Sequence, residues 1–108
     1  MSAPVMVTVL YPASQDLTFD MDYYLETHMP FVEGLLKPFG LQQAFAVDLR
    51  GTDSPYAVQA IMVFETGVEG LQKGMQAHGE EITADVAKFT NAKATRLIGG
   101  VKYPGSAS

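Results

Sequence analysis

The chain has 108 residues, of which 47% are hydrophobic and 18% charged, a balance typical of one globular domain and not of a disordered chain. Twelve acidic residues against seven scattered basic ones give a formal net charge of −5, which argues against nucleic acid or an anionic membrane as a partner. The absence of cysteine excludes disulfides, thiolate metal sites and thiol nucleophiles.

The first predicted elements are a strand and a long helix. Residues 5–11 are a run of β-branched and large apolar side chains that ends at a proline, which predicts a strand. From Asp20 to Leu36 apolar residues recur at intervals of three and four, which predicts an amphipathic helix with Asp20 as its N-cap. Pro38 and Gly40 are the expected end of this helix.

Two strands, a second helical region and a last strand follow. Residues 43–49 and 56–65 are predicted strands, joined by a loop of turn-forming residues. The second helical region begins near Val68, and we expect a break at residues 78–79 because glycine often ends a helix. Residues 93–103 are predicted to form the last strand.

The resulting order of elements is β-α-β-β-α-β. This order predicts an α+β, ferredoxin-like fold, in which a four-stranded antiparallel sheet carries both helices on one face. We expect residues 1–103 to form this single domain and residues 104–108 to form a flexible tail. Gly99 and Gly100 predict a bulge or a close backbone approach in the last strand.

Both faces of the predicted sheet are apolar. In the first strand Val7 and Val9 point to one side and Leu10 to the other, and the strand at 56–65 shows the same property. Two helices on one face leave the opposite face uncovered, and an apolar patch of that size is larger than a monomer normally exposes. The pattern therefore predicts a homodimer in which two sheets pack face to face.

The first helix carries one of the two histidines of the chain. Tyr24, His28 and Val32 are spaced four apart, so His28 faces inward beside a tyrosine and aliphatic side chains. Pro30 removes an amide hydrogen, at a cost on the order of 3 kcal/mol in a helix interior. One interpretation is a bend at Pro30 that opens a cleft beside His28. The other is a buried histidine bonded to a backbone carbonyl, with Pro30 only setting the helix angle.

Three stretches point to a known family: FDMDYYLETHMPFV at 19–32, FGLQQ at 39–43 and EEITADVAKFTNAKATRLIGGV at 80–101. Together they resemble the EthD family, named for ethyl tert-butyl ether degradation. The resemblance extends from about residue 5 to residue 103. Its most diagnostic part is an aromatic residue, a histidine and a proline on the first helix, here Tyr24, His28 and Pro30.

The resemblance implies a dimeric α+β barrel and a role in the oxidative degradation of small organic molecules. Similar barrels include monooxygenases, isomerases, cyclases and haem-dependent enzymes, with pockets between sheet and helices. The family's histidine corresponds to His28 and its aromatic residue to Tyr24. Many relatives have tryptophan beside tyrosine where this chain has Tyr23 and Tyr24, so either tyrosine is a candidate to line the pocket. Some relatives are labelled as reductases. The present sequence does not support that label, because it has no dinucleotide-binding fingerprint.

An inward histidine suits proton transfer, because imidazole takes and gives a proton near neutral pH. We therefore expect cofactor-independent proton transfer, of the isomerase, cyclase or lyase kind, on a small hydrophobic or aromatic molecule. His28 is the expected base and Tyr24 its assistant, as catalytic residues. The expected walls of the ligand site are Tyr11, Phe31 and Phe64. Asp85 lies in the last matching stretch and is expected to be structural.

Two other functions remain open at this point. A dimer with an apolar cavity is also suited to bind a hydrophobic metabolite without changing it and to deliver it to an oxygenase system. Haem ligation by His28 is the second alternative. No metal site and no cofactor are expected, since two histidines without cysteine make a poor ligand set. The chain starts without a signal peptide and has no apolar run of ~20 residues, so we expect a cytoplasmic protein.

Overall fold

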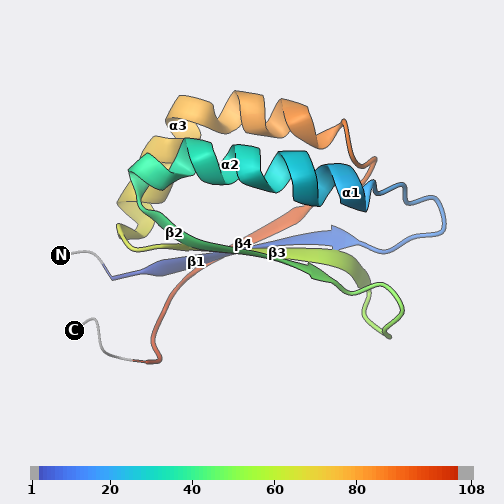
Figure 1. Cartoon of the computed structure of the whole chain (residues 1–108). Coiled ribbons are helices and arrows are strands. Elements are labelled where there is room, and N and C mark those ends of the chain that lie inside the picture. The colour runs from blue at the N-terminus through green and yellow to red at the C-terminus, as the bar shows by residue number, and fades with distance from the viewer. Residues whose placement is uncertain (1–2, 105–108) are drawn as a thin grey trace.

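The computed structural model describes residues 3–104, which form a four-stranded antiparallel sheet with all helices on one face (Figure 1). The strands, in the spatial order β2-β3-β1-β4, are β1 (Val5–Pro12), β2 (Leu41–Asp48), β3 (Tyr56–Phe64) and β4 (Thr95–Gly100). The helices are α1 (Met21–Tyr23), α2 (Met29–Leu36) and α3 (Gly67–Val86). The predicted ferredoxin-like fold is confirmed. The expected tail, apart from Pro104, lies outside the described residues.

The first helical region starts as predicted, but it is not uniform. The Asp20 carboxylate accepts a hydrogen bond from the amide of Tyr23 at 3.0 Å and so caps α1. Between α1 and α2 lies a π-helical turn, η1 (Tyr24–His28), in which the amide of Met29 bonds to the carbonyl of Tyr24. The irregularity therefore precedes Pro30. Pro30 itself stands in the first turn of α2, where a missing amide hydrogen is tolerated.

The helix end near Gly40 also follows the prediction. A 3-10 turn, η2 (Lys37–Phe39), closes the helical region, and Gly40 then adopts a left-handed backbone with φ 106°. A side chain at Gly40 would also collide with the side chain of Thr66, so glycine is required there on two grounds.

Two details of the prediction were wrong. Helix α3 runs without a break through His78 and Gly79, because Gly79 keeps a helical backbone and the helix remains packed over the sheet beyond it. In β4 the pairing with β1 continues in regular register through Gly99 and Gly100, so these glycines make no bulge.

No helix formed by residues 3–104 is long and apolar enough to cross a membrane.

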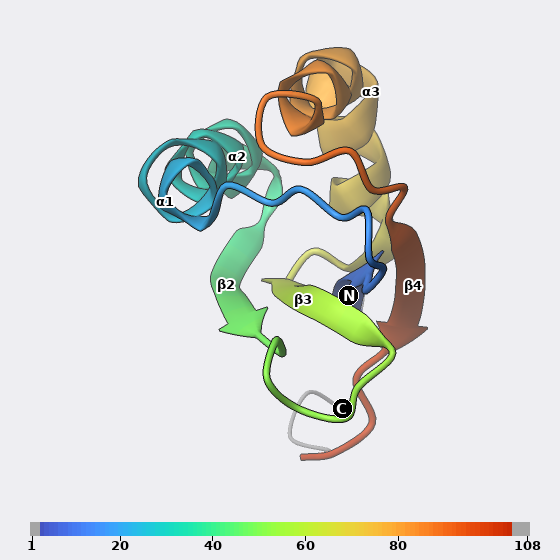
Figure 2. The ribbon, with the colours of Figure 1, turned by 90° about the vertical axis from the view of Figure 1, so that its right-hand side faces the viewer.

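The sheet presents one covered and one uncovered face, as the strand pattern predicted. Val7, Ala60 and Phe64 point toward the helices and are buried. On the opposite face lie Met6 on β1, Phe45 on β2 and Leu97 on β4, which are 39%, 49% and 54% exposed. Figure 2 shows that the helices lie on one side of the sheet only. We call this uncovered apolar surface the outer face.

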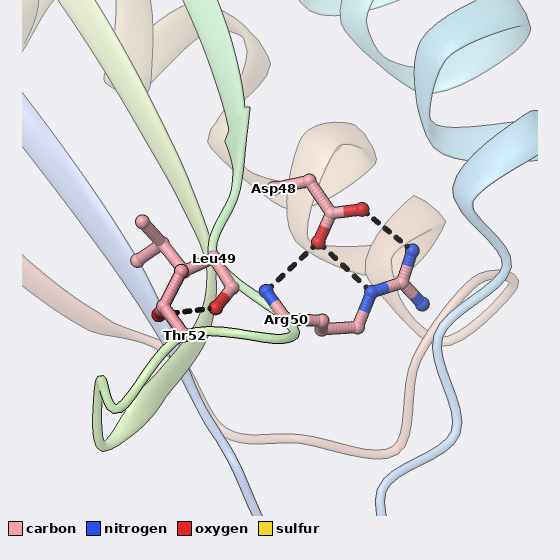
Figure 3. Close-up of polar contacts among 4 residues, drawn as sticks. All are labelled: Asp48, Leu49, Arg50 and Thr52. Atoms are coloured by element: carbon pink, nitrogen blue, oxygen red, sulfur yellow. Dashed lines mark hydrogen bonds and ion pairs between the residues drawn. The ribbon is translucent and has the colours of Figure 1, made fainter.

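The loop between β2 and β3 is ordered by its own polar residues. The carboxylate of Asp48 accepts hydrogen bonds from the Arg50 amide and guanidinium at 2.9 to 3.0 Å (Figure 3). The Thr52 hydroxyl donates to the carbonyl of Leu49 at 2.6 Å. The side-chain and backbone hydrogen bonds from Arg50 lower the pKa of Asp48. Arg50 is thus occupied within its own loop.

The continuity of α3 is tested by substitutions at two of its glycines. Gly79→Ala should stabilise the chain by about 0.5–1 kcal/mol, because alanine favours a helix interior and the added carbon makes only ordinary contacts with Met75. Gly70→Ala should destabilise it by about 1–3 kcal/mol, because the added carbon would overlap Thr66 and the backbone of Phe39. Urea unfolding measures both changes. A Gly79→Ala variant that loses stability would indicate a helix end at that residue.

Candidate functional site

Three polar side chains from two separate helical regions meet under the helices. His28, from η1, is 4% exposed, and its Nδ1 lies 2.8 Å from Oδ2 of Asp85 on α3. The other carboxylate oxygen of Asp85 accepts a hydrogen bond from the Tyr23 hydroxyl at 2.8 Å. Asp85 is itself 8% exposed. A carboxylate held from both sides thus fixes the orientation of the buried imidazole.

The surroundings of Asp85 favour its ionised form. Burial by itself would raise the pKa of Asp85, but the hydrogen bonds from His28 and Tyr23 and the charges of His28 and Lys88 outweigh it. The pKa of Asp85 is therefore lowered. The Lys88 ammonium lies 3.6 Å from Oδ1 of Asp85. The hydrogen bond from the Tyr23 hydroxyl to Asp85 raises the pKa of Tyr23, so this phenol remains a donor.

Aromatic rings enclose the imidazole. The ring centroid of Phe89 lies 4.5 Å from that of His28, and the Tyr24 ring stacks on the imidazole at 5.6 Å with an interplanar angle of 16°. Tyr24 and His28 are the first and last residues of η1. Tyr11 contacts the Tyr24 ring edge to face at 5.9 Å.

The two phenols beside the imidazole remain protonated. Burial raises the pKa of Tyr11 to about 12. Burial, together with the neighbouring Tyr11, also raises the pKa of Tyr24. The Tyr24 hydroxyl is completely buried beside the Tyr11 phenol, whose proximity contributes to the raised pKa of Tyr24, and it makes no hydrogen bond of standard geometry with a described residue. A buried donor left in this state is unusual in a folded protein.

These residues line a cavity of about 690 Å³ between the sheet and the helices. Its deep part is formed by buried side chains, among them Tyr11, Tyr24, His28, Val32 and Leu36. Its mouth is formed by exposed residues at the end of α3 and on the segment that leads into β4, among them Ala87, Asn91, Lys93 and Arg96. This volume is within the range of small-molecule sites.

The second ring nitrogen of His28 faces no protein partner. No described residue hydrogen-bonds to Nε2. Within residues 3–104, only one side-chain polar atom is both fully buried and without a hydrogen-bond partner, and that atom is the Tyr24 hydroxyl. Nε2 of His28 also lacks a partner, so it must keep some accessible surface. Nε2 is therefore reachable from the cavity. Within the same residues no three His, Asp or Glu side chains are grouped to hold a metal ion.

The structure brings together three of the five predicted site residues. His28, Tyr24 and Tyr11 all line the cavity. Phe64 faces the helices as its strand position requires, but it lies at the far end of β3 in the core and does not line the cavity. Phe31 does not line the cavity and packs, partly buried, against that core. These two residues therefore do not form walls of the cavity.

One residue of the site was missed by the sequence analysis and another has a different role. Asp85 lies 57 positions from His28 and had been interpreted as structural. Of the two tyrosines that were candidates to line the pocket, Tyr24 lines it, whereas Tyr23 bonds to Asp85. The available signal was that Asp85 lies within the last EthD-like stretch, at 80–101. His78 pairs with Glu81 on the surface of α3 and takes no part in the site.

Comparison with known proteins supports the resemblance at the level of the fold. Neither a family model nor a curated protein matches the sequence. An EthD-like protein from Ralstonia eutropha JMP134 superposes with a TM-score of 0.85 at 23% identity, over 100% of both chains. The cofactor-independent oxygenase SnoaB from Streptomyces nogalater gives 0.65 at 10% identity, over 95% of this chain and 99% of its own.

A third structure is described as a dimeric ferredoxin-like protein of unknown function, from Thermobifida fusca. It gives a TM-score of 0.58 at 11% identity, over 94% of this chain and 93% of its own. At such identities the comparisons establish a shared fold. The chain thus has the ferredoxin-like α+β fold of the EthD-like proteins, as the sequence motifs had indicated.

The role of Asp85 is tested by Asp85→Asn. Because the folded-state pKa of Asp85 lies below its ordinary value of 3.8, its carboxylate stabilises the folded chain above that pH, and the stabilisation is lost as the pH falls through the lowered pKa. Asp85→Asn should lose about 1–3 kcal/mol near neutral pH and flatten the decline in acid. Urea unfolding between about pH 3 and pH 7 measures both.

The matched control is Asp48→Asn, which also removes an ion-paired carboxylate but at an exposed position. Its effect near neutral pH should be small. Equal losses for the two variants would contradict a special role for the buried pair.

Proposed function

We propose that the cavity binds a small, mainly apolar or aromatic molecule and that His28 removes a proton from a carbon next to a carbonyl group of that molecule. The observation that carries the proposal is the combination of a lined cavity with an imidazole whose Nδ1 is held by Asp85 and whose Nε2 is free. In such a pair the histidine is oriented and its tautomer selected by the carboxylate.

The chemistry follows from this orientation. Nδ1–H donates to Asp85, which leaves the lone pair of Nε2 to accept the proton. The carbon–hydrogen bond breaks, its electron pair moves onto the carbonyl oxygen as an enolate, and Asp85 faces the positive charge that the ring acquires. Return of the proton to the same carbon gives exchange; where the substrate carries a C=C bond conjugated with the enolate, return of the proton to the far carbon of that bond completes an isomerisation. No electron is lost or gained, so the reaction is balanced without a cofactor.

Tyr24 is the candidate for stabilising the enolate oxygen. Its hydroxyl is protonated because its pKa is raised, and it forms no hydrogen bond of standard geometry with a described residue; since it is buried beside Tyr11, it must turn toward the cavity to reach the ligand. A preorganised donor in an apolar site favours a developing negative charge more than water does. Tyr23, in contrast, is engaged with Asp85 and acts by holding the carboxylate in position.

The comparisons give this proposal limited support. SnoaB is described as a cofactor-independent oxygenase, which fits chemistry that starts from a deprotonated substrate without a bound cofactor. The stretch at 19–32 and the fold shared with an EthD-like protein lead us to infer membership of the EthD family. An accessory role in the oxidative degradation of small molecules follows from that inference.

Proton transfer is tested by deuterium exchange with the model ketone β-tetralone in deuterium oxide. The wild-type protein should accelerate exchange next to the carbonyl, and His28→Gln should lower the enzymatic rate by about 10²–10⁴-fold, because the general base is lost. Proton NMR follows the exchange. His78→Gln, which changes the other, surface histidine, should retain the wild-type rate. Full activity of a folded His28→Gln variant would refute the role of His28.

A non-catalytic binding function is the alternative that the same cavity supports. In that case β-tetralone or a co-purified molecule would bind without acceleration of exchange, and transfer to an oxygenase would be the function. Haem binding through Nε2 of His28 is distinguished by the absorbance spectrum of the purified protein.

We also infer that two copies of the chain pair through the outer face. Phe45, Leu97 and Met6 form part of an apolar surface that spans β1, β2 and β4 and that no helix covers. A second copy offers the same surface with matching sheet twist, and sheets commonly pack face to face. The Thermobifida fusca protein with this fold is described as dimeric, which supports the inference.

Sedimentation at micromolar concentration should therefore give the mass of a dimer. Phe45→Asp or Leu97→Asp should shift the protein toward monomer, because each would bury a charge in an apolar interface. Val68→Asp, at an exposed apolar position of α3 on the opposite side, should leave the dimer intact. A monomeric wild-type protein would contradict the inferred interface.

A further inference from the structure

The charged groups at the cavity are of one sign. Apart from His28, its charged lining residues are Lys93, on the segment before β4, and Arg96, on the helix-facing side of β4 opposite Val9. No aspartate or glutamate of the described chain lines the cavity. The whole chain carries a formal net charge of −5, so a purely cationic rim stands out from the rest of the protein.

Within residues 3–104, neither of these cations has a carboxylate partner. The described residues form salt bridges through Arg50 and Lys88, whereas neither Lys93 nor Arg96 has a carboxylate within 4.0 Å. Their charges are therefore available to a ligand. Both residues are also exposed.

Two polar residues next to Lys93 in the chain, which also line the cavity, are already engaged. The Asn91 amide nitrogen donates to the carbonyl of Asp16, and its oxygen accepts from the amide of Thr18. The Thr90 hydroxyl donates to the carbonyl of Thr18 and accepts from the amide of Ala92. These bonds anchor the chain segment that carries Lys93. The rim is thus a fixed frame with two free cationic side chains.

We propose that the natural ligand of the cavity is an organic acid, with an apolar body and one carboxylate that binds Arg96 and Lys93 at the mouth. This inference rests on the proposed function and specifies its substrate class. The middle of the cavity is lined by aliphatic and methionine side chains, including Val9, Met62, Met75 and Ile82, which suit the apolar body. The guanidinium of Arg96 suits a carboxylate, which it binds through two parallel hydrogen bonds.

This arrangement orients the ligand. With the carboxylate at the exposed mouth, the opposite end of the molecule lies in the buried part, which His28 and Tyr24 line. Anchoring one end in this way limits the positions of the reacting carbon relative to Nε2. The two cations also attract acids from solution in spite of the negative charge of the chain.

Isothermal titration calorimetry with two matched probes tests the proposal. β-Naphthoate and β-naphthamide have the same ring system, but only the first is charged near neutral pH. At low ionic strength the wild-type protein should bind the acid about five- to twentyfold more tightly than the amide, and added salt should reduce this ratio. The double variant Lys93→Gln, Arg96→Gln should bind the two probes about equally, with unchanged affinity for the amide.

Lys73→Gln combined with Lys37→Gln is the control, because it removes the same charge from exposed positions that do not line the cavity. It should keep the preference for the acid. Equal binding of both probes by the wild-type protein would overturn this inference and leave the proposed cavity function standing. Failure of both probes to bind at millimolar concentration would overturn the proposed function and this inference together.

Discussion

The buried pair of His28 and Asp85 joins the two helical regions of the protein. The Asp85 carboxylate is 8% exposed and the His28 imidazole 4% exposed. Both are stable in this position because each is the hydrogen-bond partner of the other, and because Tyr23 and Lys88 also contact the carboxylate. Removing one partner would leave a polar group buried without compensation. The pair therefore holds η1 against the end of α3 in one register, and it orients the imidazole at the same time.

The cavity depends on the same geometry. At one end of the sheet the helices approach closely, where Gly70 and Gly74 allow α3 to contact Phe39 and Leu36. Elsewhere the space between the helices and the sheet is an open cavity. Two polar groups of its lining residues lack a hydrogen-bond partner among the described residues: the Tyr24 hydroxyl and Nε2 of His28. A folded chain that gains stability from packing usually removes such features. Their coexistence in one cavity is the main reason to assign a ligand to it.

The π-helical turn connects this site to the local sequence. The Tyr24 and His28 rings, at the two ends of η1, stack with an interplanar angle of 16°. Pro30 follows directly and lacks the amide hydrogen that a regular helix would use at that position. The proline thus accompanies a turn whose hydrogen bonds are already altered.

The sequence by itself determined the order of elements, the capping of the first helix by Asp20 and the apolar character of both sheet faces, because these depend on local periodicity and on neighbours along the chain. It also determined that His28 and Tyr24 face inward. Only the tertiary structure decided that Asp85 and Tyr23 hold His28, since these contacts join residues up to 62 positions apart. The tertiary structure also decided that α3 continues through Gly79, because packing between elements overrides the local preference of a glycine. It likewise decided that Phe31 and Phe64 lie in the core and do not line the cavity, because packing selects which aromatic residues reach a cavity.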